Sequence, residues 1–464
     1  MSSKNFTKLS DEFRNQKIFK LILKYSIPTA VGTLMFTIYN VVDRIFISRV
    51  LGNEAIAGVG ITFQIFMLFI AVGVMFGVGG ATLASLQMGK HNFRAAERIL
   101  GTLFWIFIWG GILTCAVGLI FLEPIIRLFG GTDVTMPYAK QYFGILLFFM
   151  PFDFLSMGTN NIIRSEGNPG FSMWNIAVGC VTNIILDYIF IFPLNMGVAG
   201  AAWATGISKM LSSGLVFWHF RYSSRRTLTL RWKNVKFNRK IFLRMCHIGI
   251  SPFLMQSVFA LVAIVLNHSL LNYAGDVGIT VMTINTTIFM LMSIPNHGII
   301  MGYQPITGYN YGAELYARTA ECLKIAIWSG VVVTSFLLIV VELIAPWAFG
   351  TFCNFDPELT NRWVYSLRIL MLGMPCWAFF GIASNFYQAT GRPKKTIILN
   401  VFRQVVCMPG LLLLLPLFFG INGIWIAMPL ADIIAASLVL FMIVPEYKRL
   451  KLLGNIDRAI RPIT

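Results

Sequence analysis

The sequence predicts an all-α polytopic membrane protein with twelve transmembrane helices in two pseudo-symmetric six-helix bundles. Three observations support this fold class: an apolar composition, an alternation of basic residues between connections, and an internal repeat. The 464 residues are 57% hydrophobic and only 12% charged, with a mean hydropathy of +0.73. Soluble domains carry about 25% charged residues, so this composition indicates a membrane protein.

Twelve apolar stretches are each long enough to cross roughly 30 Å of hydrocarbon. The polar, basic segment before the first stretch lacks a cleavage-site pattern, so we expect that stretch to remain as the first span. The predicted spans are 22–46, 56–86, 99–122, 136–162, 171–193, 198–220, 241–270, 278–306, 322–345, 363–389, 396–418 and 423–444.

The basic residues test this count. Of the 37 Lys and Arg, 28 lie on the side of the N-terminus, including eight in 221–240, whereas the opposite connections carry Arg49, Arg127 and Arg362. Positive residues stay in the cytoplasm, so both termini should be cytoplasmic, in a bacterial cytoplasmic (inner) membrane. Basic residues in short clusters do not form the continuous stripe typical of nucleic-acid binding, and no nucleic-acid partner is expected.

The two halves correspond at an offset near 224 residues. Met150-Pro151 matches Met374-Pro375, Gly167-Asn168-Pro169 matches Gly391-Arg392-Pro393, and GVAG at 197–200 matches GING at 420–423 with a slip of one. Each half has six spans, so the repeat is parallel, as in transporters that rock two bundles around a shared cavity. The predicted domains are an N-terminal bundle (1–220), a basic linker (221–240), a C-terminal bundle (241–445) and a cytoplasmic tail (446–464).

The linker RYSSRRTLTLRWKNVKFNRK has two interpretations. It is either a positive-inside signal that joins the halves or a contact with anionic membrane lipids, and the first is favoured. The seven cysteines are scattered without a CxxC pair, which favours helix packing over a metal or disulfide framework.

Polar residues meet at one predicted depth in the first half. Asp43 on span 1 and Asp187 on span 5 each lie six residues inside the outer end, about 9 Å at 1.5 Å per residue. Thr205 on span 6 lies at a similar depth, and Asn183 is one helical turn before Asp187. The second half has Asn267, Cys407, Leu411 and Pro429 at the equivalent positions.

Two carboxylates, an amide oxygen and a hydroxyl suit either a hard cation such as Na⁺ or a shared proton. Two nearby acids in low dielectric cannot both ionise cheaply, so such a site alternates between loaded and empty. The structural alternative is that Asp43 pairs with Arg44 while Asp187 and Asn183 make interhelical hydrogen bonds.

These residues stand in stretches that resemble the MATE (multidrug and toxic compound extrusion) transporters, most closely the prokaryotic DinF-like and MepA-like branch. The stretches include VVDRIFISRVLGNEAIAGVG, RSEGNPG, NIILDYIFIF followed by GVAGAAWATGIS, and GIIMGYQPITGYNYGA. The resemblance covers nearly the whole chain. It implies two six-helix bundles around a cavity, a cation site at Asp43, Asn183, Asp187 and Thr205, and export driven by inward H⁺ or Na⁺ flow without a cofactor.

The expected function is therefore cation-coupled antiport of amphipathic, often cationic organic compounds by a monomer in contact with membrane lipids. A flippase for a lipid-linked saccharide is the alternative, although the acidic site argues against it. No catalytic cluster is evident, so the chain is predicted not to be an enzyme.

Five further residues are candidates for substrate contact or gating: Asn40, Asp153, Tyr188, Gln256 and Asp432. Asp153 is expected to find a basic partner, and Asp432 either contacts substrate or pairs with Lys209. Tyr188 stands where many relatives have Pro, so any bend in span 5 should be weaker here or lie elsewhere. Gln256 and Asn385 occupy neighbourhoods where another branch carries acids, which puts a second cation site in doubt.

Overall fold

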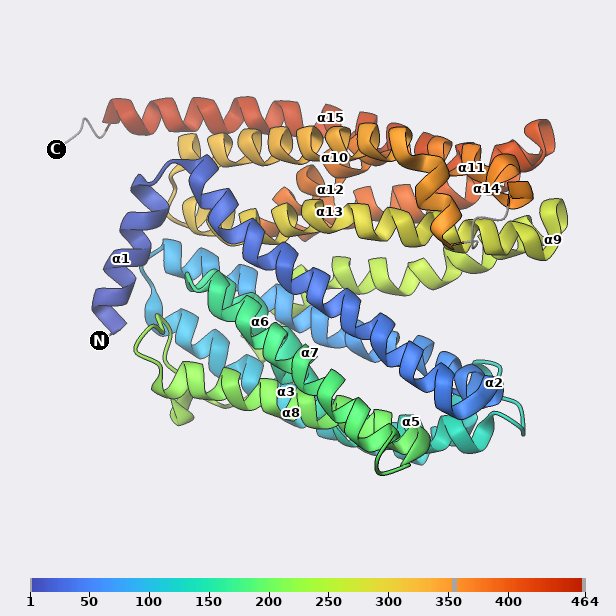
Figure 1. Cartoon of the computed structure of the whole chain (residues 1–464). Helices are drawn as coiled ribbons and strands as arrows, with labels where there is room; N and C mark the ends of the chain where they lie inside the picture. The colour runs from blue at the N-terminus through green and yellow to red at the C-terminus, as the bar shows by residue number, and fades with distance from the viewer. Residues whose placement is uncertain (1, 353–356, 461–464) are drawn as a thin grey trace. The chain divides into compact units, whose positions relative to one another are not determined.

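The computed structural model describes residues 2–352 and 357–460, and these residues form helices joined by short connections (Figure 1). The α-helices are α1 (Ser2–Asn15), α2 (Ile18–Gly89), α3 (Phe93–Ile120), α4 (Leu122–Leu128), α5 (Met136–Phe148), α6 (Met150–Ser165), α7 (Pro169–Ile191), α8 (Gly197–Tyr222), α9 (Arg239–Gly312), α10 (Tyr316–Phe352), α11 (Pro357–Met371), α12 (Met374–Ala389), α13 (Pro393–Val401), α14 (Met408–Phe419) and α15 (Ile421–Ile460). A short 3₁₀ turn, η1 (Trp232–Asn234), lies in the linker, and a π-helical segment, η2 (Phe402–Cys407), joins α13 to α14.

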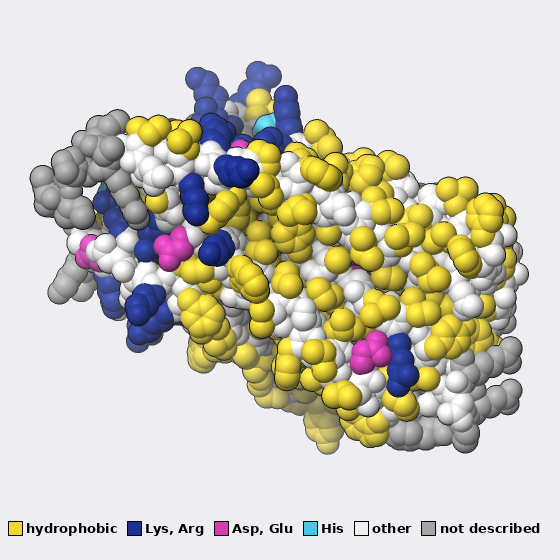
Figure 2. Space-filling model, turned by 90° about the horizontal axis from the view of Figure 1, so that it is seen from above, with side chains coloured by type: hydrophobic (Ala, Val, Ile, Leu, Met, Phe, Trp, Pro, Cys, Tyr) yellow, Lys and Arg dark blue, Asp and Glu magenta, His cyan; other side chains and the backbone are white. Residues whose placement is uncertain are grey.

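The helices confirm the predicted membrane class. Within the described residues, ten helical stretches are long and apolar enough to span a membrane, and the bent pair α5 and α6 adds an eleventh. The sixth predicted span corresponds to α8, whose 26 residues extend about 39 Å. On the face shown in Figure 2, hydrophobic side chains cover most of the surface and Lys and Arg gather toward one end.

The helix bounds differ from the predicted spans at three places. Helical turns continue through the connection between spans 1 and 2, within α2, and through the connection between spans 7 and 8, within α9. Each pair still forms two separate membrane-length stretches, Ile18–Asp43 with Gly58–Gly89 and Arg239–Val258 with Val277–Gly312. In α9 the chain departs from helical geometry only at Gly275, whose φ of 59° suits a residue without a Cβ. The predicted tail also continues helix α15 as far as Ile460, well beyond 444.

Contacts divide the chain into two compact units. Unit 1 comprises Met1–Phe13 and Val31–Phe253, and unit 2 comprises Arg14–Ala30 and Leu254–Thr464. This division differs from the predicted boundaries because Gly298 and Gly302 of α9 pack against the backbone around Ser26, which places the first turns of α2 in unit 2. Unit 1 therefore keeps α2 from Val31 onward and the whole linker.

The repeat is visible as matching helix ends. The break at Phe149 between α5 and α6 bends the chain by 60°, and α12 begins 224 residues after α6, again with Pro at its second position. Gly167 and Gly391 both adopt positive φ, 98° and 75°, directly before the helices that start at Pro169 and Pro393. Span 4, predicted as one helix, is thus a bent pair, because the proline ring cannot continue the preceding helix.

Candidate functional site

The four predicted cation-site residues all lie in unit 1, on three helices. Helix α2 carries Asp43, α7 carries Asn183 and Asp187 one turn apart, and α8 carries Thr205. Residues four apart share one face of a helix, so Asn183 and Asp187 project together from α7. Helices α7 and α8 run antiparallel as neighbours after the short turn at 192–196 (Figure 1).

The structure brings these side chains together. The Asn183 amide Nδ2 donates a hydrogen bond to Thr205 Oγ1 over 3.3 Å. Asp43 lies close enough to Asp187 for the two carboxylates to interact electrostatically. Asp187 is fully buried, Asn183 is 1% exposed and Thr205 is 7% exposed. Four residues distant in sequence therefore form one polar cluster among apolar helices.

The cluster presents oxygen atoms toward its interior. Both carboxylate oxygens of Asp187 and the amide oxygen of Asn183 are buried and accept no hydrogen bond from the described residues. A buried acceptor without a partner is costly, and a proton or a hard cation at this point would satisfy several acceptors at once. The donor set fits both ions. The side chain of Arg44, the alternative partner for Asp43, lies outside the described part of the chain.

A cavity of about 340 Å³ adjoins the cluster inside unit 1. Asp43 and Thr205 line it, so they belong to both the cluster and the cavity wall. The rest of the wall combines aromatic and sulfur side chains with a few polar groups: Phe36, Tyr39, Phe63, Phe66, Met67, Tyr142, Asn40, Gln64 and Lys209. An apolar wall with few convergent polar groups is typical of small-molecule sites.

Lys209 provides the cationic end of this cavity. Its Nζ lies 2.9 Å from Asp153 Oδ1 and 5.7 Å from the centre of the Phe36 ring. Asp153 is thus paired with a basic residue, as expected from the sequence, and the partner comes from α8. The pair spans α6 and α8, and the lysine side chain is only 16% exposed.

Asp432 has a different partner from the one proposed. Its Oδ1 accepts a hydrogen bond of 2.6 Å from Arg403 Nε, within unit 2. Asp432 and Lys209 therefore each have an oppositely charged partner within their own unit, Arg403 and Asp153 respectively. Arg403 lies in the π-helical segment η2, where the altered helical turn accompanies its approach to α15.

The other candidates have separate environments. Asn40 lines the cavity and donates to the Phe36 carbonyl over 2.7 Å. Tyr188 is 57% exposed and lies beside Phe192, while α7 continues unbroken to Ile191. Gln256 lies on α9 with an exposed side chain. Tyr188 and Gln256 do not line the cavity described here.

Sequence reasoning missed Tyr39, Tyr142 and the place of Lys209 in the cavity wall. Tyr142 of α5 lies near Asp43, Asp187 and Thr205, and Tyr39 lies near Asp43 and Lys209. Tyr39 precedes Asp43 by four residues and Lys209 follows Thr205 by four, so helical spacing could have indicated both. Tyr142 had no such signal, because its position depends on the bend after α5.

Comparisons with known proteins agree with the predicted resemblance. The MatE family profile matches residues 28–189 and 248–413, more than half of the chain. A protein named "Multidrug export protein MepA" from Staphylococcus saprophyticus is 26% identical over 440 residues, covering 93% of this chain and 95% of the relative. Its namesake from Staphylococcus aureus strain MRSA252 is 25% identical, with the same coverage of both chains.

Solved structures share the fold. A structure described as the "outward-facing conformation of a multidrug resistance MATE family transporter" superposes with a TM-score of 0.89 at 24% identity, covering 95% of this chain and 98% of the other. A MOP-superfamily transporter from Pyrococcus furiosus, whose binding pocket is described as reversed in polarity, superposes with a TM-score of 0.87 at 24% identity and the same coverage.

Proposed function

Because the chain belongs to the MatE family, we propose that it is a secondary active multidrug exporter that couples efflux of amphipathic, often cationic organic compounds to inward flow of H⁺ or Na⁺. Its relatives named as multidrug export proteins support this assignment, and they are exporters rather than enzymes. We place it in a bacterial cytoplasmic membrane with both termini in the cytoplasm.

The observation that carries the proposal is the double role of Asp43. Its carboxylate lines the cavity and also interacts with the buried Asp187. A cationic compound in the cavity would be attracted to Asp43, and an H⁺ or Na⁺ in the cluster would neutralise the same charge. Both ligands cannot gain the full interaction together, so loading one weakens binding of the other.

Alternating access follows from this competition. Cation loading would change the charge at the junction of α2, α7 and α8. The free-energy difference between the inward-open and outward-open conformations would then change by the difference between their cation-binding free energies. The aromatic wall and Met67 supply an adaptable apolar surface that accepts rings of different shape. The lipid-linked saccharide alternative gains no support, because the cavity offers an acidic group and aromatic rings rather than a mainly basic surface.

The proposal is tested with Asp43→Asn and Asp187→Asn in inverted vesicles, with the Na⁺ and pH gradients imposed separately. We expect either variant to lose at least about 90% of gradient-driven drug efflux at normal protein level, because the uncharged amide cannot release a coupling cation. Asp133→Asn is the matched control, since that carboxylate is 87% exposed in a connection.

The gradient that drives efflux identifies the coupling ion. Efflux that depends on the pH gradient alone assigns H⁺, and efflux that depends on the Na⁺ gradient alone assigns Na⁺. Full efflux by both aspartate variants, or efflux that neither gradient affects, would contradict the proposed coupling.

A further inference from the structure

The basic linker 221–240 takes no part in the proposed transport site. It contains eight Lys or Arg residues and no Asp or Glu. A chain of this composition would extend freely into water unless other contacts held it. We therefore consider how the linker is attached to unit 1 and which of its side chains remain accessible.

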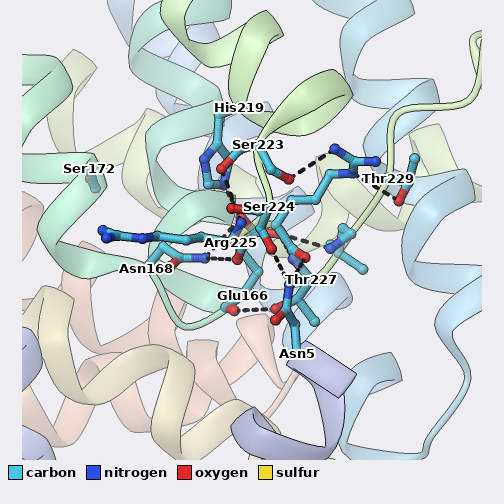
Figure 3. Close-up of polar contacts among 12 residues, drawn as sticks. Asn5, Glu166, Asn168, Ser172, His219, Ser223, Ser224, Arg225, Thr227 and Thr229 are labelled. Atoms are coloured by element: carbon cyan, nitrogen blue, oxygen red, sulfur yellow. Dashed lines mark hydrogen bonds and ion pairs between the residues drawn. The ribbon is translucent and has the colours of Figure 1, made fainter. Parts of the chain in front are cut away.

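Glu166, at the end of α6, fixes the first part of the linker (Figure 3). Its carboxylate is buried and accepts hydrogen bonds from the backbone N–H groups of Thr227 and Leu228, at 3.1 and 2.9 Å. The same carboxylate contacts His219 Nε2, and the Thr227 hydroxyl donates to the Glu166 carbonyl over 2.9 Å.

Two amides extend this attachment. Asn5 of α1 donates to the carbonyls of Ser224 and Arg226, at 2.7 and 2.8 Å, and Asn168 donates to that of Arg225 at 3.0 Å. In Figure 3 the side chains of Asn5, Glu166 and Asn168 meet the linker backbone. Its path is therefore set by hydrogen bonds to the backbone, and of its basic side chains Arg226 adds one more, to the Ser223 carbonyl over 2.9 Å.

The second part of the linker, 231–240, lies against α3 and α8. Arg231 pairs with Glu97 of α3 at 2.9 Å, and the Trp232 ring lies 5.8 Å from Phe217 of α8. A Cβ on Gly101 of α3 would come within 2.3 Å of the Asn234 carbonyl oxygen, so glycine allows the linker backbone to approach the helix closely. Segment 231–240 is thus held in place rather than free.

This segment ends where a membrane span begins. The stretch Arg239–Val258 is long and apolar enough to cross a bilayer, so residues 231–240 lie at its polar boundary. Trp232 is 62% exposed and Phe237 is 47% exposed. Exposed aromatic residues at this level are typical of the interface between headgroups and acyl chains.

The charges beside these rings lack internal partners. Arg231 is the only linker cation that forms an ion pair within the described residues. Lys233, Lys236, Arg239 and Lys240 are all exposed. Four accessible cations and two exposed aromatic rings on one fixed segment match the chemistry of an acidic phospholipid, whose headgroup is anionic and whose neighbouring glycerol and acyl region is apolar.

We propose that segment 231–240 binds the headgroups of acidic phospholipids in the cytoplasmic leaflet and anchors unit 1 to the membrane interface. The fixed backbone presents the cations together, so little ordering is needed when lipid binds. The proposal is independent of ion coupling, because none of these residues lines the cavity or the cation cluster.

The test titrates phosphatidylglycerol and phosphatidylcholine into the purified full chain in a neutral detergent. Lys233→Gln, Lys236→Gln and Arg239→Gln are combined in one variant. Each charge contributes roughly a fivefold effect on binding to an acidic surface, so the triple variant should bind phosphatidylglycerol about 100-fold more weakly. Phosphatidylcholine binding should not change.

The matched control removes the same charge from three exposed positions at and just before the start of α3 in unit 1: Lys90→Gln, Arg94→Gln and Arg98→Gln. We expect it to retain phosphatidylglycerol binding within about threefold, since the rings beside those cations, Phe6 and Phe93, pack on each other and are only partly exposed. Unchanged binding by the linker variant, or an equal loss in the control, would overturn the proposal.

Two further measurements separate the alternatives. Trp232→Ala should weaken binding of phosphatidylglycerol but not of the water-soluble headgroup glycerophosphoglycerol. If the unaltered protein binds the soluble headgroup as tightly as the lipid, the segment recognises a free phosphodiester and not a membrane lipid. Labelling of a C-terminal tag in sealed cells reports orientation. If the triple linker variant loses lipid binding and also inserts into the membrane in the opposite orientation, these charges set the orientation of the protein and do not bind lipid.

Discussion

Several buried charges among the described residues are found as pairs. In unit 1, Asp153 and Lys209 join α6 to α8, and in unit 2, Arg403 and Asp432 join η2 to α15. An isolated ion in an apolar interior is expensive, and a partner at hydrogen-bond distance offsets most of that cost. The Asp43 and Asp187 cluster differs, because two like charges meet there. That difference supports the proposal that the cluster holds a mobile cation.

At the residue scale, we predict that breaking the Asp153–Lys209 pair destabilises unit 1. Asp153→Asn or Lys209→Met alone should cost about 3–5 kcal/mol, because each leaves a buried charge without its partner. The double variant should recover a large part of this loss. Thermal unfolding of the purified protein in detergent measures all three, and additive losses in the double variant would show that the two residues do not interact. Asp133→Asn, which breaks an exposed pair, should change little.

Helix crossings depend on glycine where a bend brings backbones together. In α3, a Cβ on Gly111 would come within 2.4 Å of the Pro151 Cα, at the start of α6 after the bend. A Cβ on Gly77 of α2 would come within 2.7 Å of the Gly158 Cα of α6. Small residues allow close approach between membrane helices, and here they position α6, which carries Asp153 beside the cavity lysine.

At the scale of the element, Gly110 and Gly111 form a matched pair of neighbours in α3. Gly111→Ala should destabilise the protein by about 1–3 kcal/mol, because the new methyl group meets backbone that cannot move aside. Gly110→Ala should be neutral or slightly stabilising, since no atom lies within 4 Å of a Cβ there. Melting temperatures in detergent compare the two variants. Equal melting temperatures would argue against a tight contact between α3 and α6.

The whole molecule combines a duplicated scaffold with an unduplicated site. Matching breaks and positive-φ glycines recur near an offset of 224 residues in both units. The polar cluster does not recur, because Leu411 replaces Asp187 and Pro429 replaces Thr205 at the equivalent positions. The two bundles therefore share one arrangement of helices. The residues of the proposed cation site differ between the halves, so this site occurs in unit 1 alone among the described residues.

At this scale, Glu166 determines whether the linker stays attached to unit 1. Glu166→Gln keeps the side-chain shape but removes the charge that two backbone N–H groups and His219 contact. Hydrogen bonds to a charged group contribute about 1.5–3 kcal/mol, so the linker should open more often and trypsin should cleave it at least about tenfold faster. Mass spectrometry of the fragments identifies cleavage after Arg225 or Arg226.

The exposed Glu314 of another connection provides the control: Glu314→Gln should leave the cleavage rate of the linker unchanged. If Glu166→Gln is also cleaved at the unaltered rate, the linker is held by other contacts.

The sequence by itself determined the membrane class, most span positions, the repeat and the family, because these depend on local hydropathy, on charge counts and on short motifs. It also placed Asp43, Asn183, Asp187 and Thr205 at one depth, since depth follows from the helical rise alone. Only the tertiary structure decided the pairing of Asp153 with Lys209 and of Asp432 with Arg403, the entry of Tyr142 into the cluster, and the attachment of the linker by Glu166. These contacts depend on how each helix is rotated and bent against its neighbours. The 60° bend between α5 and α6 is an example, because it changes the direction of all the side chains of α6.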